Sequence, residues 1–207
     1  CFSDVTNIVG DGSDASWVSC NGWALWSMAE HARLTNDPAW ITTHKKQILD
    51  GCDWILRERR LSSQQPDNPC AGLIYGKFVC DMPDNGPVKG VGYFTYNDAI
   101  SYKGLHEIAC VLDDFGNSEG KALLGEAEQY RQDIVAAVDR ATDKSRDPWY
   151  IPWALHAPKR EDNYLNGVCG PINLAYGGVL SRSDPRIQHV IRWNIEHVYQ
   201  GSPERSA

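Results

Sequence analysis

The sequence has no run of 18 apolar residues, and it does not start with a basic segment followed by an apolar one. A membrane-spanning helix needs about 20 mostly apolar residues, and a signal peptide needs a charged region before an apolar one. The pattern therefore predicts neither a membrane partner nor a signal peptide, and it leaves the compartment open.

Basic clusters are scarce as well. The formal net charge is −7, and the one segment rich in arginine, 57–60, also contains Glu58. A protein that binds a phosphate backbone needs a basic surface. We therefore exclude nucleic acid as a partner.

The chain lacks the short motifs of most cofactor- and metal-dependent enzymes. It has no C-x-x-C pair, G-x-S-x-G elbow, Walker loop or dinucleotide fingerprint. His106-Glu107 begins like a zinc-binding helix, but Cys110 stands where H-E-x-x-H has its second histidine. We expect no metal and no cofactor.

Seven cysteines are an odd number. Cys20, Cys52 and Cys110 fall within helical patterns, where thiols usually behave as small buried apolar residues. Cys70 and Cys80 flank a loop and are candidates for a disulfide bond, which spacing alone does not establish.

Aromatic residues are plentiful, with eight Trp and nine Tyr in a chain of ordinary hydrophobic content, 42%. Their rings combine a large apolar face with a polar edge, which suits both helix packing and stacking on sugar rings. We expect most of them to be packing residues.

A weak internal repeat organises the chain. Three times, a polar aromatic segment leads into an apolar helix, a short turn and a second amphipathic helix, with turns at 34–38, 115–119 and 180–185. Asp37 and Asp184 are expected N-caps, with Pro38 and Pro185 at the first helical position, and Ser118 is expected to cap in the same way. Repeated helical hairpins must stack around a shared core.

The apolar spacing predicts an inner and an outer helix in each pair. The first pair is expected at 18–34 and 38–60. The second has an apolar surface over 105–115, followed by a stripe at Leu123, Ala127, Tyr130, Ile134, Ala137 and Ala141. The third has a short inner helix over 172–180 and an outer stripe at Ile187, Val190, Ile191, Ile195 and Val198.

Two long segments, 61–95 and 143–167, separate the hairpins and are rich in Gly, Pro, Asn and aromatic residues. Segments of this length in a compact domain are usually functional or disordered, and their aromatic content argues against disorder. Because they lead into the inner helices, we expect the three helix starts, near 15–23, 93–99 and 162–167, to gather at one end and form a site. Helix N-termini also offer free N–H donors there.

These residues resemble the six-hairpin glycosidase superfamily over nearly the whole chain. The resemblance rests on Asn21-Gly22-Trp23-Ala24-Leu25 through Asp37-Pro38, on Trp54-Ile55, on Gly72-Leu73-Ile74-Tyr75-Gly76 with Asp81, and on Tyr96-Asn97-Asp98 through Tyr102-Lys103-Gly104-Leu105. It implies an all-α fold, an (α/α)6 toroid of inner and outer helices with a sugar site at one mouth. It also implies a carbohydrate substrate, polysaccharide degradation and a secreted or periplasmic location.

The chain departs from that family in size, because three hairpins make half of a six-hairpin ring. We expect residues 1–207 to form a single domain that is a partial toroid. It is either a fragment of a longer enzyme, which its two ends favour, or a reduced domain that pairs with a second copy. An unclosed half would expose an apolar edge.

Glycoside hydrolysis usually needs two carboxyl groups, one protonated and one ionised. Asp81 and Asp98 are the chosen catalytic pair, because both fall in segments expected at the loop-rich mouth and Asp98 has aromatic neighbours that can raise its pKa. Asp98 has the alternative role of a first-turn residue that favours the helix dipole. Competing carboxylates are Asp11, Asp14, Glu161 and Asp162.

The expected sugar contacts are aromatic and amide side chains near the three helix starts: Trp17, Trp23, Tyr96, Asn97, Tyr102, Trp153 and Tyr164. Inversion and retention both stay open, since the carboxyl separation decides between them. A polysaccharide lyase or a sugar epimerase, with Tyr96, Tyr102 or His106 in the main role, is the alternative on the same fold. A non-catalytic sugar-binding or scaffold module is another.

Overall fold

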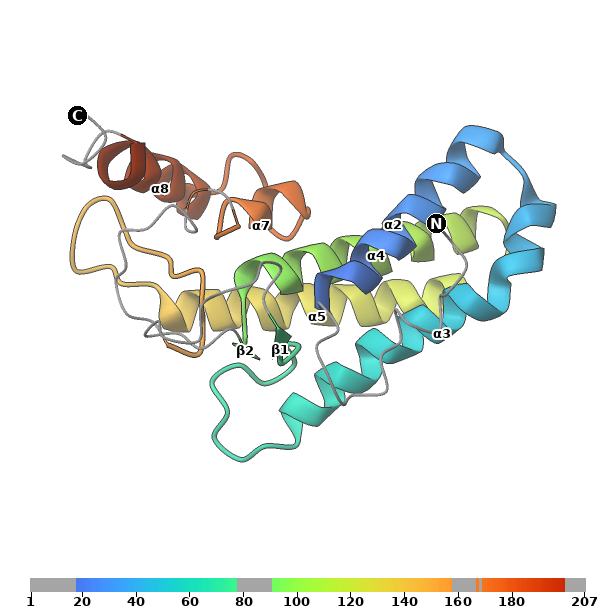
Figure 1. Ribbon diagram of the computed structural model, residues 1–207, viewed down its shortest axis with the longest axis horizontal. Helices are drawn as coiled ribbons and strands as arrows, with labels where there is room; N and C mark the ends of the chain where they lie inside the picture. The colour runs from blue at the N-terminus through green and yellow to red at the C-terminus, as the bar shows by residue number, and fades with distance from the viewer. Residues whose placement is uncertain (1–17, 78–90, 158–166, 168, 200–207) are drawn as a thin grey trace.

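The computed structural model describes residues 18–77, 91–157, 167 and 169–199, and it is mostly helical, which confirms the all-α class. Figure 1 shows α4 and α5 running side by side, with α2 and α3 oblique to them and with α7 and α8 beyond the start of α4. Of the sequence candidates, Trp17, Asp81 and Tyr164 lie outside the described residues, as do Asp11, Asp14, Glu161 and Asp162.

The first hairpin consists of α2 (Val18–Thr35) and α3 (Pro38–Ser63), close to the predicted bounds. Asp37 caps α3 as expected, because its Oδ1 accepts from the N–H groups of Ala39 and Trp40 at 2.9 and 3.1 Å. The chain reverses at Asn36, whose φ of 49° lies in the left-handed region. A local turn signal therefore set this boundary.

The second hairpin consists of α4 (Thr95–Asp114) and α5 (Glu119–Ala141). Ser118 directly precedes α5, but its predicted capping role is wrong. Its hydroxyl donates to Glu119 Oε2 at 3.1 Å, and its backbone is helical, so the side chain does not reach the N–H groups of the first turn. The predicted apolar stripe of α5 is buried except for Ala141, which packs at the edge of the core.

The third pair is much shorter than the first two. Its inner part contains α7 (Asn173–Tyr176), and its outer helix α8 (Pro185–Trp193) continues as a π-helix, η1 (Asn194–Tyr199). The expected helix over 172–180 is wrong in length, because Gly177 and Gly178, the latter with φ +81°, follow directly and end it. The Asp184 cap is confirmed, with its Oδ1 accepting from Arg186 N at 2.9 Å.

A two-stranded antiparallel sheet, β1 (Gly76–Lys77) with β2 (Val91–Gly92), lies beside the starts of α2 and α4. In α8 and η1 the predicted stripe is only partly buried. Ile187, Val190 and Val198 are in the core, whereas Ile191 and Ile195 are exposed. Those two face away from the packed side of this helix.

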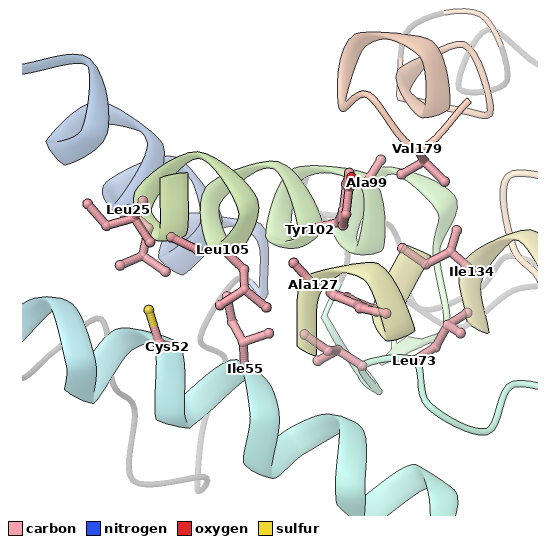
Figure 2. Packing of buried hydrophobic residues seen from close by; sticks show 14 of the residues in the cluster. Leu25, Cys52, Ile55, Leu73, Ala99, Tyr102, Leu105, Ala127, Ile134 and Val179 are labelled. Atoms are coloured by element: carbon pink, nitrogen blue, oxygen red, sulfur yellow. The ribbon is translucent and has the colours of Figure 1, made fainter. Parts of the chain in front are cut away.

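The core gathers side chains from all four long helices and from the segment between α3 and β1. Figure 2 shows Leu25, Ile55, Leu105 and Ala127 converging from α2, α3, α4 and α5. The inner helix α4 contacts α2, α3, α5 and α7, which makes it the centre of the domain.

The inner helices approach each other closely. A Cβ on Gly22 of α2 would clash with the carbonyl oxygen of Ile100, and one on Gly104 of α4 would clash with the backbone of Gly22. On the other side of α4, a Cβ on Gly177 would clash with the carbonyl oxygen of Ala99. Glycine therefore permits the contacts that hold α2, α4 and the α7 segment together.

Candidate functional site

Several segments meet at the N-terminal end of α4. Two of the three predicted helix starts, those of α2 and α4, lie here, and most of the third, 162–167, lies outside the described residues. Asn97 Nδ2 donates to the carbonyl oxygen of Lys77 at 2.8 Å, which ties β1 to α4. Thr95 N donates to the carbonyl oxygen of Trp153 at 3.0 Å, which ties the segment after α5 to the same place. The start of α2 is there too, because a Cβ on Gly76 would clash with the Val18 side chain.

Asp98 lies in the first turn of α4 and is completely buried. Its Oδ1 accepts two hydrogen bonds, from the phenol of Tyr130 at 2.7 Å and from the N–H of Ile74 at 2.9 Å. Its Oδ2 has no hydrogen-bond partner among the residues that the structure describes. Because both lone pairs of Oδ1 are engaged, a proton on this carboxyl group resides on Oδ2.

The burial of Asp98 raises its pKa to about 7, since desolvation of the carboxylate outweighs the two hydrogen bonds and the charge of Arg59. Tyr130 is equally buried, and desolvation followed by the nearby Asp98 charge raises the pKa of its phenol well above the ordinary range. At neutral pH a sizeable fraction of Asp98 is therefore protonated, which a general acid requires.

Arg59 packs against the Tyr130 ring and so holds the Tyr130–Asp98 pair in place. Its guanidinium lies 4.3 Å from the centre of the Tyr130 ring, and it donates to Asp133 Oδ2 at 2.9 Å and to the carbonyl oxygen of Gly72 at 3.0 Å. Gly72 has φ +83°, and a Cβ there would clash with Asp133. The outer helices α3 and α5 thus hold both Tyr130 and the segment that contacts Asp98.

Asn97, next to Asp98, is also buried, and its Oδ1 has no hydrogen-bond partner within the described residues. Two neighbouring side chains at the start of α4 therefore each have one polar atom that no described residue binds. A buried polar atom of this kind costs about 1–3 kcal/mol unless something binds it. The pair is the clearest polar feature of this end of the domain.

A group of aromatic rings that are at least partly exposed comes from the first half of α2, the first turn of α4 and α7. The indole N–H of Trp23 donates to the Tyr96 hydroxyl at 3.1 Å, so the structure brings two of the predicted sugar contacts together. The Trp23 ring centre lies 5.1 Å from that of Trp26 and 6.2 Å from that of Tyr176 in α7. Three elements, α2, α4 and α7, contribute these rings.

Two other predicted sugar contacts are core residues. Trp153 is buried and stacks on Phe94, with ring centres 5.3 Å apart and planes at 15°. Tyr102 is buried against Tyr130 on one side and His106 on another. Neither ring offers a face to a ligand in this arrangement, because protein atoms cover it.

The residues that the sequence did not single out are Tyr130 and Arg59 behind Asp98, and Trp26, Lys103 and Tyr176 on the surface. Tyr130 was expected only as part of an apolar stripe, since its partner Asp98 is 32 residues away. One signal in the sequence points to a partner for Tyr130: it is the one tyrosine in a stripe of aliphatic and alanine residues, and a buried phenol hydroxyl needs a hydrogen-bond partner.

The buried thiols are not reactive groups. Cys52 and Cys70 are free and buried, and desolvation is the main reason that the pKa of each is raised to about 12. Cys80, the proposed disulfide partner of Cys70, lies outside the described residues. Cys20 and Cys110 are only partly buried.

In the part of the chain that the structure describes, no three His, Cys, Asp or Glu side chains are grouped as metal ligands. Within the same residues, no helix combines the length and the hydropathy that crossing a bilayer demands. No protein-family model, curated protein or solved structure matches this chain.

Proposed function

We propose that this chain is a carbohydrate-active domain, part of an α/α toroid, that hydrolyses a glycosidic bond by carboxylate acid/base catalysis. The observation that carries the proposal is the Asp98 carboxyl group at the start of the central inner helix. One of its oxygens is fully hydrogen-bonded and the other has no partner among the described residues. Partly exposed Trp and Tyr rings lie on the same inner helices.

In the proposed reaction, Asp98 donates the proton on Oδ2 to the glycosidic oxygen as the bond to the anomeric carbon breaks. Asp81, as the second carboxylate, either removes a proton from the attacking water or attacks the anomeric carbon before water does. Lys77, four residues before Asp81 in the sequence, is hydrogen-bonded to Asn97 beside Asp98. This link supports the choice of Asp81.

Substrate contacts are assigned to Trp23 and Tyr96, with Asn97 Oδ1 as an acceptor for a sugar hydroxyl, and to Trp17 and Tyr164. Rings of this kind stack on the apolar faces of pyranoses. Asp98 has no exposed surface, so in the proposed reaction Oδ2 must become accessible before a sugar reaches it. The remaining half of the ring, or a second copy of the chain, is the proposed partner.

A binding module without catalysis is the second candidate, and the complete burial of Asp98 is the observation that favours it. Such a module would use the aromatic rings alone. The two functions differ in one measurable respect, because only the first releases new reducing ends from a polysaccharide.

The test measures reducing-sugar release from a panel of neutral and acidic polysaccharides by the full chain and by D98N and D81N. We expect each variant to lose at least 100-fold in turnover, the usual scale for removing an acid or base. D37N is the matched control, because Asn caps a helix as well as Asp does and Asp37 lies at the opposite end of α2.

Equal turnover by D98N and the wild type would remove Asp98 from the mechanism. Sugar binding by calorimetry without any turnover would favour the binding module over the hydrolase. Products with new ultraviolet absorbance would identify a lyase, which leaves an unsaturated sugar. A chain that neither binds nor cleaves any member of the panel would refute the carbohydrate proposal.

A further inference from the structure

Trp26, Tyr176 and Lys103 form a compact surface group on α2, α7 and α4, which we call the Lys103 cluster. The Trp26 and Tyr176 rings are almost perpendicular, at 88°, with centres 5.9 Å apart. Tyr176 is 50% exposed. The glycine contacts between α2, α4 and the α7 segment fix the distances between these helices, so the rings are held in place rather than carried on a loose loop.

Lys103 places a positive charge against both rings. Its Nζ lies 4.7 Å from the centre of the Trp26 ring and 5.5 Å from that of Tyr176. The side chain is only 16% exposed, and its nearest carboxylate oxygen, on Glu107, is 4.0 Å away. Within the described residues the ammonium makes no hydrogen bond, although it has three N–H donors. A mostly buried ammonium group without a hydrogen bond favours a ligand that supplies hydrogen-bond acceptors.

The charges around Lys103 determine which ligand suits it. Arg33 pairs with both neighbouring carboxylates, at 2.8 Å to Glu30 and 2.6 Å to Glu107. Trp26 also donates its indole N–H to Glu30 at 3.0 Å. Two cations and two carboxylates therefore balance, and an acidic sugar at Lys103 would meet Glu107 close by. A neutral sugar has no such penalty.

We propose that the Lys103 cluster is a subsite for a neutral sugar ring, whose apolar face lies on the exposed Tyr176 ring with the partly exposed Trp26 ring at its edge, while its hydroxyl oxygens accept hydrogen bonds from Lys103. The inference rests on the proposed carbohydrate function. It adds three residues to the site and narrows the substrate to a saccharide that is uncharged at this position. Trp23 connects this subsite to Tyr96 at the start of α4.

The experiment measures binding of four neutral tetrasaccharides, of β-1,4-glucose, α-1,4-glucose, β-1,4-mannose and β-1,4-xylose, and of tetragalacturonate as the acidic probe. Calorimetry on the full chain gives the affinity, and the fluorescence of its eight tryptophans gives a second signal of binding. The variants are Lys103→Met, which keeps an apolar stem over the rings, and Tyr176→Ala, which removes an exposed ring. Circular dichroism checks that both fold.

Matched controls are Lys46→Met, at an exposed lysine of α3, and Tyr199→Ala, at an exposed tyrosine of η1. We expect at least one neutral tetrasaccharide to bind the wild type, with the affinity at least tenfold weaker in each test variant. In the controls, we expect it to stay within twofold.

Neutral tetrasaccharide binding that Lys103→Met and Tyr176→Ala leave unchanged would overturn the subsite and leave the carbohydrate function standing. Binding of tetragalacturonate in preference to every neutral probe would overturn the assignment to a neutral sugar. If the wild type binds none of the five, the proposed function fails, and the subsite fails with it.

Discussion

The Tyr130 hydroxyl donates a 2.7 Å hydrogen bond to Asp98 Oδ1, and both side chains are completely buried. This contact joins the middle of the outer helix α5 to the first turn of the inner helix α4. The N–H of Ile74 binds the same oxygen, so three separate parts of the chain converge on one carboxyl group. The protonation of Asp98 is therefore coupled to the packing of this end of the domain.

The first prediction concerns the pH dependence of stability. In the folded chain the pKa of Asp98 is raised from 3.8 to about 7, so between these values the folded state holds a proton that the unfolded state has released. Stability from this group is fully present below about pH 4 and is lost as the pH rises to about 7. Each pKa unit corresponds to about 1.4 kcal/mol.

D98N isolates this effect, because Asn carries no titrating proton. We expect the free energy of unfolding of D98N minus that of the wild type to increase between pH 4 and 7, by up to a few kcal/mol, and to be constant above. Urea unfolding at closely spaced pH values measures it. Parallel curves for the two proteins would mean that Asp98 titrates normally and is not buried as described.

The second prediction concerns Tyr130. Y130F removes the O–H donor and keeps the ring under Arg59, so the buried Oδ1 retains only the Ile74 N–H. We expect a loss of about 1–2 kcal/mol in the free energy of unfolding at neutral pH, and a further rise in the pKa of Asp98, since this hydrogen bond favours the ionised form.

A double-mutant cycle between Y130F and D98A checks that the loss comes from this contact, because alanine removes the Oδ1 acceptor that asparagine would keep. The coupling energy for two residues in contact is about 0.5–3 kcal/mol, whereas separate effects would simply add. Losses that simply add would show that the loss in Y130F does not come from the contact between the Tyr130 hydroxyl and Asp98.

The long helices could be predicted from the sequence because their signals are local. Asp37-Pro38 and Asp184-Pro185 mark the starts of α3 and α8, and the apolar period of α5 shows which side is buried. The helix expected over 172–180 failed for a related reason. The apolar residues of this segment indicate that it is buried, and Leu174, Val179 and Leu180 are indeed buried. A buried segment need not be helical, however.

The candidate site was only partly predictable. Asp98 was identified because a carboxylate at the start of an aromatic-flanked helix is visible in the sequence. Its contacts with Tyr130 and, through that ring, with Arg59 depend on how distant helices pack, which no local pattern reports. Trp153 and Tyr102 show the same limit, since an aromatic residue near a helix start can face the core as readily as a ligand.

The third prediction compares the N-caps. Asp37 and Asp184 each accept hydrogen bonds from first-turn N–H groups, so D37A and D184A should each cost about 0.5–2 kcal/mol of unfolding free energy. S118A should cost almost nothing, because the Ser118 hydroxyl does not cap α5. Chemical denaturation of the three variants provides the comparison. A loss for S118A as large as that for D37A would contradict the observed geometry.

The last prediction concerns the close approach of α2 and α4. A Cβ on Gly22 or Gly104 would clash with backbone atoms of the facing helix, which cannot move aside as a side chain can. We expect G22A and G104A each to destabilise the fold by more than about 2 kcal/mol, since overpacking a rigid contact typically costs 1–3 kcal/mol or more.

Gly125 is the matched control for these two. It lies within α5 with no heavy atom within 4 Å of the position that a Cβ would take. Alanine there relieves the entropic cost of a helical glycine, so G125A should stabilise the domain by about 0.5–1 kcal/mol. Thermal unfolding of the three single variants measures both signs, and stabilisation by G104A would mean that α2 and α4 do not pack backbone against backbone. The same Gly→Ala change raises helix propensity about equally at all three positions. If G22A and G104A destabilise the domain while G125A stabilises it, the contact between α2 and α4 therefore accounts for the difference in unfolding free energy.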